Sequence, residues 1–191
     1  MSTHTVYRFV ERRGFEGLQA FTEPIPAVGE HDILVRARSV GLNFRDIAIA
    51  TDSYPLSVKD RVIPCSDMVG EVAAVGRLAT GFAVGDRVMA PPAITFQAGA
   101  VPPDHDTFGG PVDGLLAEYT VLPARATIKL PKSPHSFAEW AAFIGTGATV
   151  WNTFYGNKPL LPGESVLLQG MIVFPFPSYL SPPHPLSLDV R

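Results

Sequence analysis

The side chains that could bind a metal ion are few and scattered. Cys65 is the one cysteine, so the chain can form no internal disulfide and no cysteine-built zinc site. The densest remaining group is Asp104–Asp106, in which His105 stands between two aspartates. This group directly follows two prolines and is typical of a solvated turn. We therefore predict that the protein binds no metal.

The charge balance argues against a polyanionic partner. The 191 residues include 15 basic and 18 acidic side chains, which gives a formal net charge of −3. Proteins that bind nucleic acid or anionic membranes usually carry a basic patch. The sequence shows no signal-peptide core near its start and no run of about 18 apolar residues. We expect a globular, cytoplasmic protein that binds neither nucleic acid nor membranes.

The elements that would position a site are predicted to be short strands up to about residue 130. The 17 glycines and 19 prolines supply the turns between such strands. Phe44–Ala50 is predicted to be a short helix, and Asp32–Val40 alternates apolar with basic residues as a half-solvated strand does. The other predicted strands are Val6–Val10, Leu18–Phe21, Asp67–Val75, Gly85–Ala90, Ala117–Leu122 and Ala126–Leu130. Many short, irregularly spaced strands indicate a barrel or a sandwich.

Near residue 135 the pattern changes to α/β. Ser136 and Glu139 form a capping box that predicts a helix through Ala142. Apolar pairs at i,i+4 spacing predict a second helix from about Thr146 to Tyr155. The apolar run Ser165–Gln169 is typical of a strand buried in a parallel sheet.

Two segments follow no period. Pro91–Gly114 is rich in glycine, proline and aspartate, and a loop of that length is usually functional or mobile. Residues 171–191 contain five prolines, which exclude a regular strand or helix. We expect no packed element in this tail.

Five motifs resemble, in the same order, segments of the medium-chain dehydrogenase/reductase superfamily. They are Gly41–Asp46, Ile63–Val72 with Val75–Gly76, Phe82–Val88, Gly110–Gly114 with Ala117–Tyr119, and Leu161–Gly170. Each motif has little specificity by itself, but their shared order across residues 5–170 makes a strong resemblance. The similarity is greatest to the zinc-free branch, which is quinone oxidoreductase-like or alcohol dehydrogenase-like.

The resemblance implies a mainly β fold with α elements. We expect a GroES-like barrel, the amino-terminal domain of alcohol dehydrogenases, at residues 1–130. Bridging helices and the first strand of a Rossmann domain would occupy 131–170, and a proline-rich tail foreign to the fold would occupy 171–191. The implied activity is hydride transfer between NADP or NAD and a small carbonyl, alcohol or quinone-like substrate.

The resemblance also bears on zinc. Where zinc-dependent members carry a cysteine ligand, this sequence has Asn43. Their histidine–glutamate pair is replaced by Ser66–Asp67, and the third ligand position aligns near Gly145. The cysteine-rich lobe for structural zinc is absent as well, so the resemblance implies a member without zinc.

Two residues are candidates for catalysis by this resemblance. Asn43 would donate a hydrogen bond to the oxygen of a developing enolate, or it is simply a turn residue after Gly41. Tyr54 would supply a proton or contact the substrate, although its ordinary pKa of about 10 makes it a weak acid. The alternative for Tyr54 is a partly buried packing role.

Three further residues lie in the same motifs. Asp46 and Asp67 would line the substrate cleft, or would pair with Arg45 or Arg61 instead. Cys65 stands where relatives usually have a small residue, and we interpret it as core filler rather than a nucleophile.

Two residues are matched to cofactor binding. Thr149 corresponds to a threonine that lies against the nicotinamide in relatives, although helix packing would also explain it. Gly170 would be the first glycine of the turn that binds pyrophosphate. The rest of that turn and its helix do not follow, so we expect that the reading frame departs from the family at Gly170.

These expectations lead to two hypotheses. The first is an oxidoreductase-family fragment that is inactive as this chain. It would have no oligomeric partner, because the domain that commonly dimerises is missing. The second is a non-enzymatic GroES-like interaction module or a non-functional gene-model product.

Overall fold

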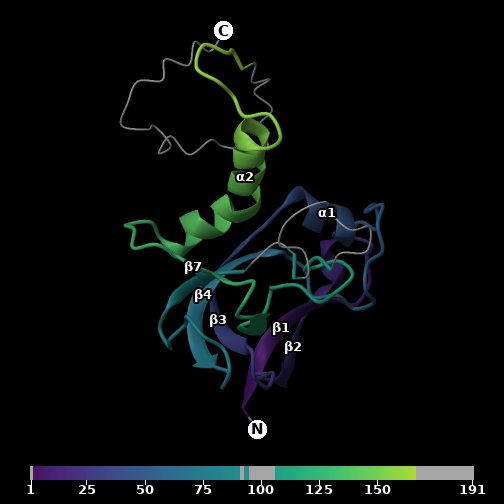
Figure 1. Ribbon diagram of the computed structural model, residues 1–191. Coiled ribbons are helices and arrows are strands. Elements are labelled where there is room, and N and C mark those ends of the chain that lie inside the picture. The colour runs from purple at the N-terminus through teal and green to yellow at the C-terminus, as the bar shows by residue number, and fades with distance from the viewer. Residues whose placement is uncertain (1, 91–92, 95–105, 167–191) are drawn as a thin grey trace. The chain divides into compact units, whose positions relative to one another are not determined.

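The computed structural model describes residues 2–90, 93–94 and 106–166, and the chain divides into two compact units, Met1–Gly145 and Thr146–Arg191. The first unit contains every strand of the described residues (Figure 1). The strands are β1 (Thr3–Phe9), β2 (Leu18–Pro24), β3 (Asp32–Gly41), β4 (Asp67–Val75), β5 (Arg87–Met89), β6 (Tyr119–Pro123) and β7 (Ile128–Lys129). The helices are α1 (Phe44–Ala50), α2 (Phe137–Tyr155) and a 3₁₀ turn at Phe15–Gly17.

The larger sheet has five antiparallel strands in the order β6-β3-β4-β5-β7. Its longest pairing joins β3 to β4, with Val40 opposite Met68. The register of this pair shifts at Leu34/Val35 and again at Ala37/Ser39. Such irregularities bend a strand and increase its twist, which curves the sheet around its contents.

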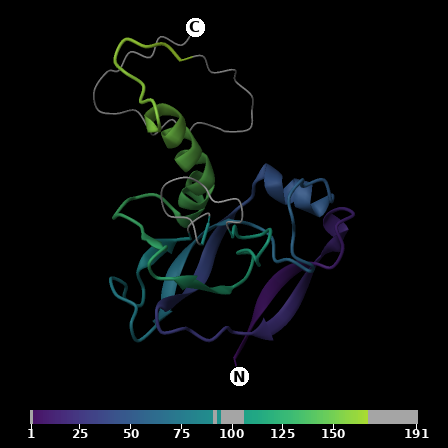
Figure 2. The ribbon, with the colours of Figure 1, turned by 45° about the vertical axis from the view of Figure 1, so that its right-hand side comes forward.

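A second, two-stranded sheet formed by β1 and β2 adjoins the first (Figure 2). The segment just before β6 links the two. Tyr7 donates its backbone N–H to the carbonyl of Leu116 at 3.1 Å, and Glu118 donates its own to the carbonyl of Thr5 at 3.0 Å. The first strand of the chain is thereby fixed to a segment more than a hundred residues later.

The main core lies against β3 and β4. It is built from fully buried side chains such as Ile33, Val35 and Met68, together with Leu122 of β6. Because Ile33, Leu34 and Val35 are all buried, both faces of β3 are covered at its start. The predicted alternation of buried and solvated residues begins only after Val35.

The helix α2 corrects one prediction. Two helices were expected, ending at Ala142 and restarting at Thr146, but one helix runs without a break from Phe137 to Tyr155. Its capping box is confirmed, since Glu139 accepts the backbone N–H of Ser136 at 2.7 Å. Gly145 costs the helix roughly 1 kcal/mol relative to alanine and does not prevent its formation.

The remaining sequence predictions have mixed outcomes. Phe44–Ala50 and Asp67–Val75 are confirmed as a helix and a strand with the predicted bounds. Phe108, predicted to lie in an irregular loop, is buried in the main core. Ser165 and Val166 are not in a strand, and residues 167–169 and the tail 171–191 lie outside the described residues.

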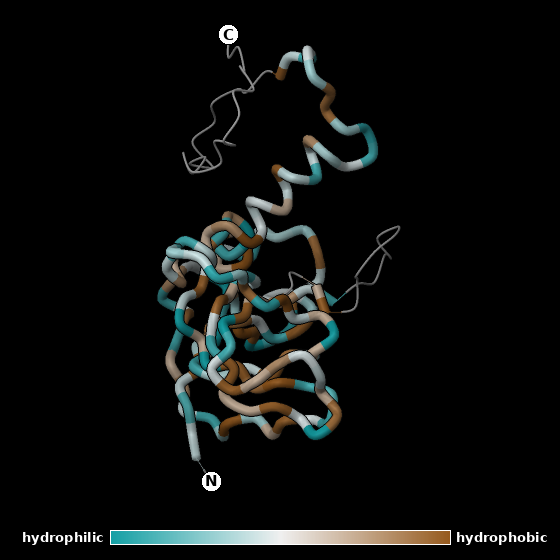
Figure 3. Tube along the Cα trace, turned by 60° about the vertical axis from the view of Figure 1, so that its left-hand side comes forward, coloured by the Kyte–Doolittle hydropathy of each residue, from teal (hydrophilic) through white to brown (hydrophobic). Residues whose placement is uncertain are grey.

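No helix of the described residues is both long and apolar enough to cross a bilayer. Apolar and polar residues alternate over short distances along the described trace, as short strands and turns require (Figure 3).

The full burial of Ile33 in the core leads to a stability prediction. Replacing Ile33 with alanine should lower the free energy of unfolding by about 2–5 kcal/mol, because the side chain is fully buried and its removal leaves a cavity. Val84→Ala, at a side chain that is 69% exposed, should change it by less than about 0.5 kcal/mol. Urea unfolding measures both, and equal effects would contradict this placement of the core.

Candidate functional site

A polar cluster forms where α1 begins. Asn43 is the N-cap of α1, and it forms a capping box with Asp46. The backbone N–H of Asn43 donates to Oδ2 of Asp46 at 2.8 Å, and its side-chain Nδ2 donates to Oδ2 of Asp67 at 3.0 Å. The structure therefore brings together three of the predicted site residues, with Asn43 between the two carboxylates.

Asp67 lies at the first position of β4 and is only 3% exposed. Its Oδ2 accepts the Asn43 amide and also the backbone N–H of Gly145 at 3.2 Å. Its Oδ1 accepts a longer hydrogen bond, 3.4 Å, from the Ser66 hydroxyl. The alternative that Asp67 pairs with Arg45 or Arg61 is not seen among its contacts within the described ranges.

Asp46 is half-buried, and burial raises the pKa of its carboxyl. The backbone N–H groups of Asn43 and Cys65 oppose that rise, the second donating to Oδ1 at 3.1 Å. Cys65 itself is 1% exposed and has a left-handed backbone (φ 71°). Burial, reinforced by the nearby carboxylates, raises the pKa of its thiol, so the thiolate that a nucleophile needs is disfavoured.

Arg45 was not predicted from the sequence to belong to the site, yet its guanidinium contacts three residues there. Its Nη1 donates to the carbonyl of Phe108 at 2.7 Å, and its Nη2 donates to Oγ1 of Thr107 at 3.0 Å. The guanidinium also lies 5.2 Å from the centre of the Tyr54 ring, within the range of a cation–π contact. Arg45 thus ties α1 to the loop before residue 110 and to Tyr54.

Tyr54 is half-buried and packs against a small cluster that includes Phe9 and Ile49. Tyr54 therefore has the partly buried packing role that was the alternative from the sequence. Arg45 contacts one side of its ring. A partly exposed tyrosine in this position can still present its hydroxyl to a ligand.

The resemblance assigned two residues, Thr149 and Gly170, to cofactor binding. Thr149 belongs to the second unit, is exposed, and accepts a hydrogen bond from Thr153 Oγ1 through its carbonyl at 2.8 Å. Gly170 lies outside the described residues.

The resemblance places Asn43, Ser66, Asp67 and Gly145 at the positions where zinc-dependent members carry their ligands. The equivalent positions supply an amide, a hydroxyl, one carboxylate and a glycine, whereas zinc sites use three or four thiolate, imidazole or carboxylate ligands. Moreover, both oxygens of that carboxylate already accept hydrogen bonds. Within residues 2–90, 93–94 and 106–166, no three His, Cys, Asp or Glu side chains are grouped to hold a metal.

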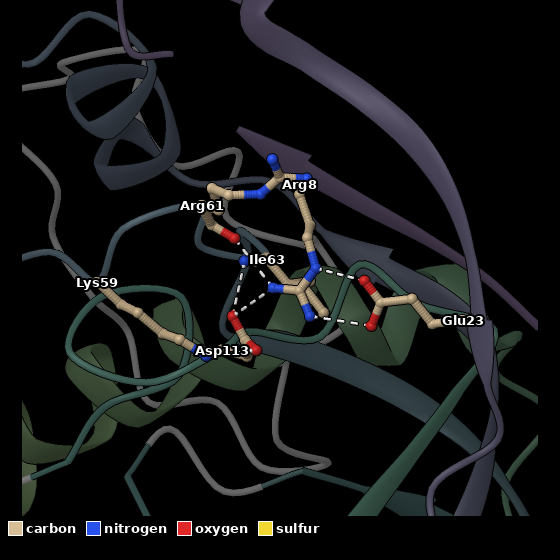
Figure 4. Close-up of polar contacts among 6 residues, drawn as sticks. All are labelled: Arg8, Glu23, Lys59, Arg61, Ile63 and Asp113. Atoms are coloured by element: carbon tan, nitrogen blue, oxygen red, sulfur yellow. Dashed lines mark hydrogen bonds and ion pairs between the residues drawn. The ribbon is translucent and has the colours of Figure 1, made fainter. Parts of the chain in front are cut away.

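A charged cluster around Arg8 contacts residues 59–63, which precede Asp67 in the chain (Figure 4). Arg8 on β1 donates to both oxygens of Glu23 at 2.6 and 3.0 Å, and to Oδ1 of Asp113 at 3.0 Å. Asp113 also accepts from Lys59 at 2.7 Å and from the backbone N–H of Ile63 at 3.1 Å. We call these five residues the Arg8 clamp.

The charges of the clamp perturb one another. The hydrogen bond from Arg8 lowers the pKa of Glu23. Burial alone would raise the pKa of Asp113, but the hydrogen bonds from Lys59, Ile63 and Arg8 outweigh burial and lower it. Both carboxylates are therefore better stabilised in the folded chain than in the unfolded chain.

Comparison with known proteins gives one family. The model of the alcohol dehydrogenase GroES-like domain matches residues 29–132. A zinc-type alcohol dehydrogenase-like protein of Schizosaccharomyces pombe is 34% identical over 166 residues, which cover 84% of this chain and 47% of that protein. The chain spans about half the length of the relatives it matches.

Solved structures give the same picture. A NAD-dependent alcohol dehydrogenase superposes with a TM-score of 0.77 at 28% identity, over 85% of this chain and 50% of that chain. The quinone oxidoreductase of Pseudomonas syringae pv. Tomato DC3000 superposes with a TM-score of 0.68 at 28% identity, over 86% and 44%. The predicted fold, mainly β with a following helix, is confirmed.

The Arg8 clamp predicts how stability depends on pH. Because Glu23 and Asp113 have lowered pKa values in the folded state, their contribution is present above their unfolded pKa values of about 4 and is lost as the pH falls through the folded values. Arg8→Met should lower the free energy of unfolding by about 2 kcal/mol at pH 7 and by less at pH 2.5.

Arg77→Met is the matched control, since the Arg77–Glu30 pair is 72% and 60% exposed. Its effect should stay below about 0.5 kcal/mol. Urea unfolding at both pH values measures each variant, and an Arg8→Met effect that does not depend on pH would contradict the electrostatic account.

Proposed function

Because this chain belongs to the medium-chain dehydrogenase/reductase superfamily through its alcohol dehydrogenase GroES-like domain, we propose that it is the substrate-facing part of an oxidoreductase. The reaction would be hydride transfer to or from a small carbonyl, alcohol or quinone-like substrate. The observation that carries the proposal is the fixed amide of Asn43 at the start of α1.

Asn43 is the group proposed to contact the reacting oxygen. Its hydrogen bond to Asp67 uses one of the two hydrogens on Nδ2, and within the described residues no acceptor is paired with the other. A fixed N–H aimed at an oxygen that gains negative charge stabilises the transition state without reorganisation.

Tyr54 is proposed as the second polar group at the substrate. Arg45 and the Phe9–Ile49 cluster hold its ring in place. Asp46 would act through the backbone of Asn43, to which it is hydrogen-bonded, rather than by direct contact with substrate.

The exposed surface beside Asn43 is apolar. Leu42 and Phe44, on either side of it in sequence, are 78% and 74% exposed, and Ile47 one turn later is 48% exposed. These side chains favour an uncharged substrate with an apolar body.

When bound, NADPH or NADH would supply the hydride for reduction, and NADP⁺ or NAD⁺ would accept it in the reverse direction; the alcohol dehydrogenase of similar fold is NAD-dependent. Thr149 and Gly170 remain the residues proposed to approach it. We propose a reaction without zinc, on the ground that the donors at positions 43, 66, 67 and 145 do not suit that metal.

We propose that this chain by itself is inactive, because about half of the length of its relatives is not matched. A second candidate, a binding module without catalysis, is favoured by the exposure of Trp151, Tyr155 and Leu161 in the second unit, at 68%, 51% and 57%.

The inactivity of the chain is tested by cofactor binding. Purified chain titrated with NADPH and with NADH should show no saturable change in nicotinamide fluorescence. Saturable binding of either cofactor would contradict this part of the proposal and would exclude the binding module without catalysis.

The role of Asn43 is tested in a chimera that joins residues 1–166 to the remaining half of the Schizosaccharomyces pombe relative. It should reduce 2-cyclohexenone or 9,10-phenanthrenequinone with NADPH or NADH, and EDTA should not abolish the activity. Asn43→Ala should lower kcat about 100-fold, which is typical for loss of one oxyanion donor.

Gln19→Ala, an exposed position on β2, is the control and should leave kcat unchanged. A kcat for Asn43→Ala within twofold of the parent chimera would overturn the role assigned to Asn43.

A further inference from the structure

We infer that Asp67 is a positioning residue that orients the side-chain amide of Asn43. We infer also that Asp67 can do so only if residue 145 is glycine. The inference rests on the proposed function, because it concerns the residue proposed to contact substrate. It changes the role expected for Asp67 from the sequence, which was to line the substrate cleft.

The carboxylate of Asp67 is buried. With 3% exposure it offers almost no surface to a ligand. No lysine or arginine forms an ion pair with it among the described residues, so hydrogen bonds must replace the lost hydration. Asn43, Gly145 and Ser66 provide those hydrogen bonds.

Asp67 fixes the orientation of the Asn43 amide. The Oδ2 oxygen that faces Asn43 is a hydrogen-bond acceptor, since it also accepts the backbone N–H of Gly145. Therefore only Nδ2 of Asn43, and not Oδ1, can face Asp67 at 3.0 Å. Asp67 thus selects one of the two flipped orientations of the amide, and the second Nδ2 hydrogen projects from a fixed position.

Gly145 lies too close to Asp67 to carry a side chain. A Cβ atom at this position would lie 2.8 Å from Oδ2 of Asp67, closer than real Cβ contacts allow. The backbone N–H of Gly145 also donates to that same oxygen. Any side chain at position 145 would push away the oxygen that orients Asn43, although α2 itself would remain a good helix.

The segments that carry these groups approach one another closely. A Cβ at Gly41 would lie 3.1 Å from Cβ of Asp67 and 2.7 Å from the carbonyl oxygen of Ala141. Ala141 and Ile144 of α2 pack against Val69 of β4. This packing brings the backbone of α2 within hydrogen-bonding reach of Asp67.

The test reads the Asn43 side chain directly by NMR of the ¹⁵N-labelled chain, with its NH₂ signals assigned by their loss in Asn43→Ser. Asp67→Leu should move the two proton shifts toward those of a free amide and speed NH₂ hydrogen exchange at least tenfold. Asp67→Asn, which keeps an acceptor oxygen, should restore most of the chemical-shift difference between the two Nδ2 protons of Asn43.

Gly145→Ala is the second variant and keeps the carboxylate while displacing it. It should reproduce a large part of the change that Asp67→Leu causes in the Asn43 NH₂ signals. Ser66→Ala should change these signals little. Unchanged Asn43 signals in folded Asp67→Leu would overturn the inference, and so would unchanged signals in Gly145→Ala if Asp67→Leu does not fold.

A separate arm tests the proposed function. Titration of the wild-type chain with 2-cyclohexenone should shift the Asn43 Nδ2 proton that does not face Asp67, and in Asp67→Leu the shift should be at least fivefold weaker. No shift in the wild type would count against substrate contact by Asn43, while the orientation by Asp67 would still be decided by the variants above.

Discussion

The buried carboxylate of Asp67 is the interaction on which the candidate site depends. It joins the start of α1, the start of β4 and the middle of α2 through hydrogen bonds to one side chain. A buried carboxyl group of this kind is tolerated only while its hydrogen-bond donors stay in place, because each lost donor leaves a buried polar oxygen without a partner. The three segments are therefore held together by hydrogen bonds to Asp67 as well as by apolar packing.

Local patterns were sufficient for the elements around the site. The bounds of α1 and β4 followed from an apolar run next to a turn and from a β-like run with one glycine. The break expected within α2 was wrong, because glycine lowers helix propensity without forbidding a helix, and packing of Ala141 and Ile144 against β4 compensates. Packing against β4, and not helix propensity alone, therefore accounts for the continuity of α2.

The grouping of Asn43, Asp46 and Asp67 was expected from the resemblance, but the role of each was not. The hydrogen bond from Gly145 to Asp67 spans 78 residues, and no local period encodes such a contact. Arg45 was missed for a related reason. Its partners Phe108 and Thr107 lie in a stretch whose sequence shows no periodicity.

The Arg8 clamp also has a consequence for the order of folding. Arg8 and Asp113 are 105 residues apart, and β1 is also hydrogen-bonded to Leu116 and Glu118. Contacts of such long range close slowly, because the entropy of the intervening chain is lost before any bond forms. During synthesis the β1–β2 hairpin leaves the ribosome early, yet its hydrogen bonds to Leu116 and Glu118 can form only after residue 118 has followed. Until then Val6 lacks the cover that Leu116 and Ala117 give it in the folded chain. This first hairpin is thus exposed to association with other chains until a late stage of synthesis.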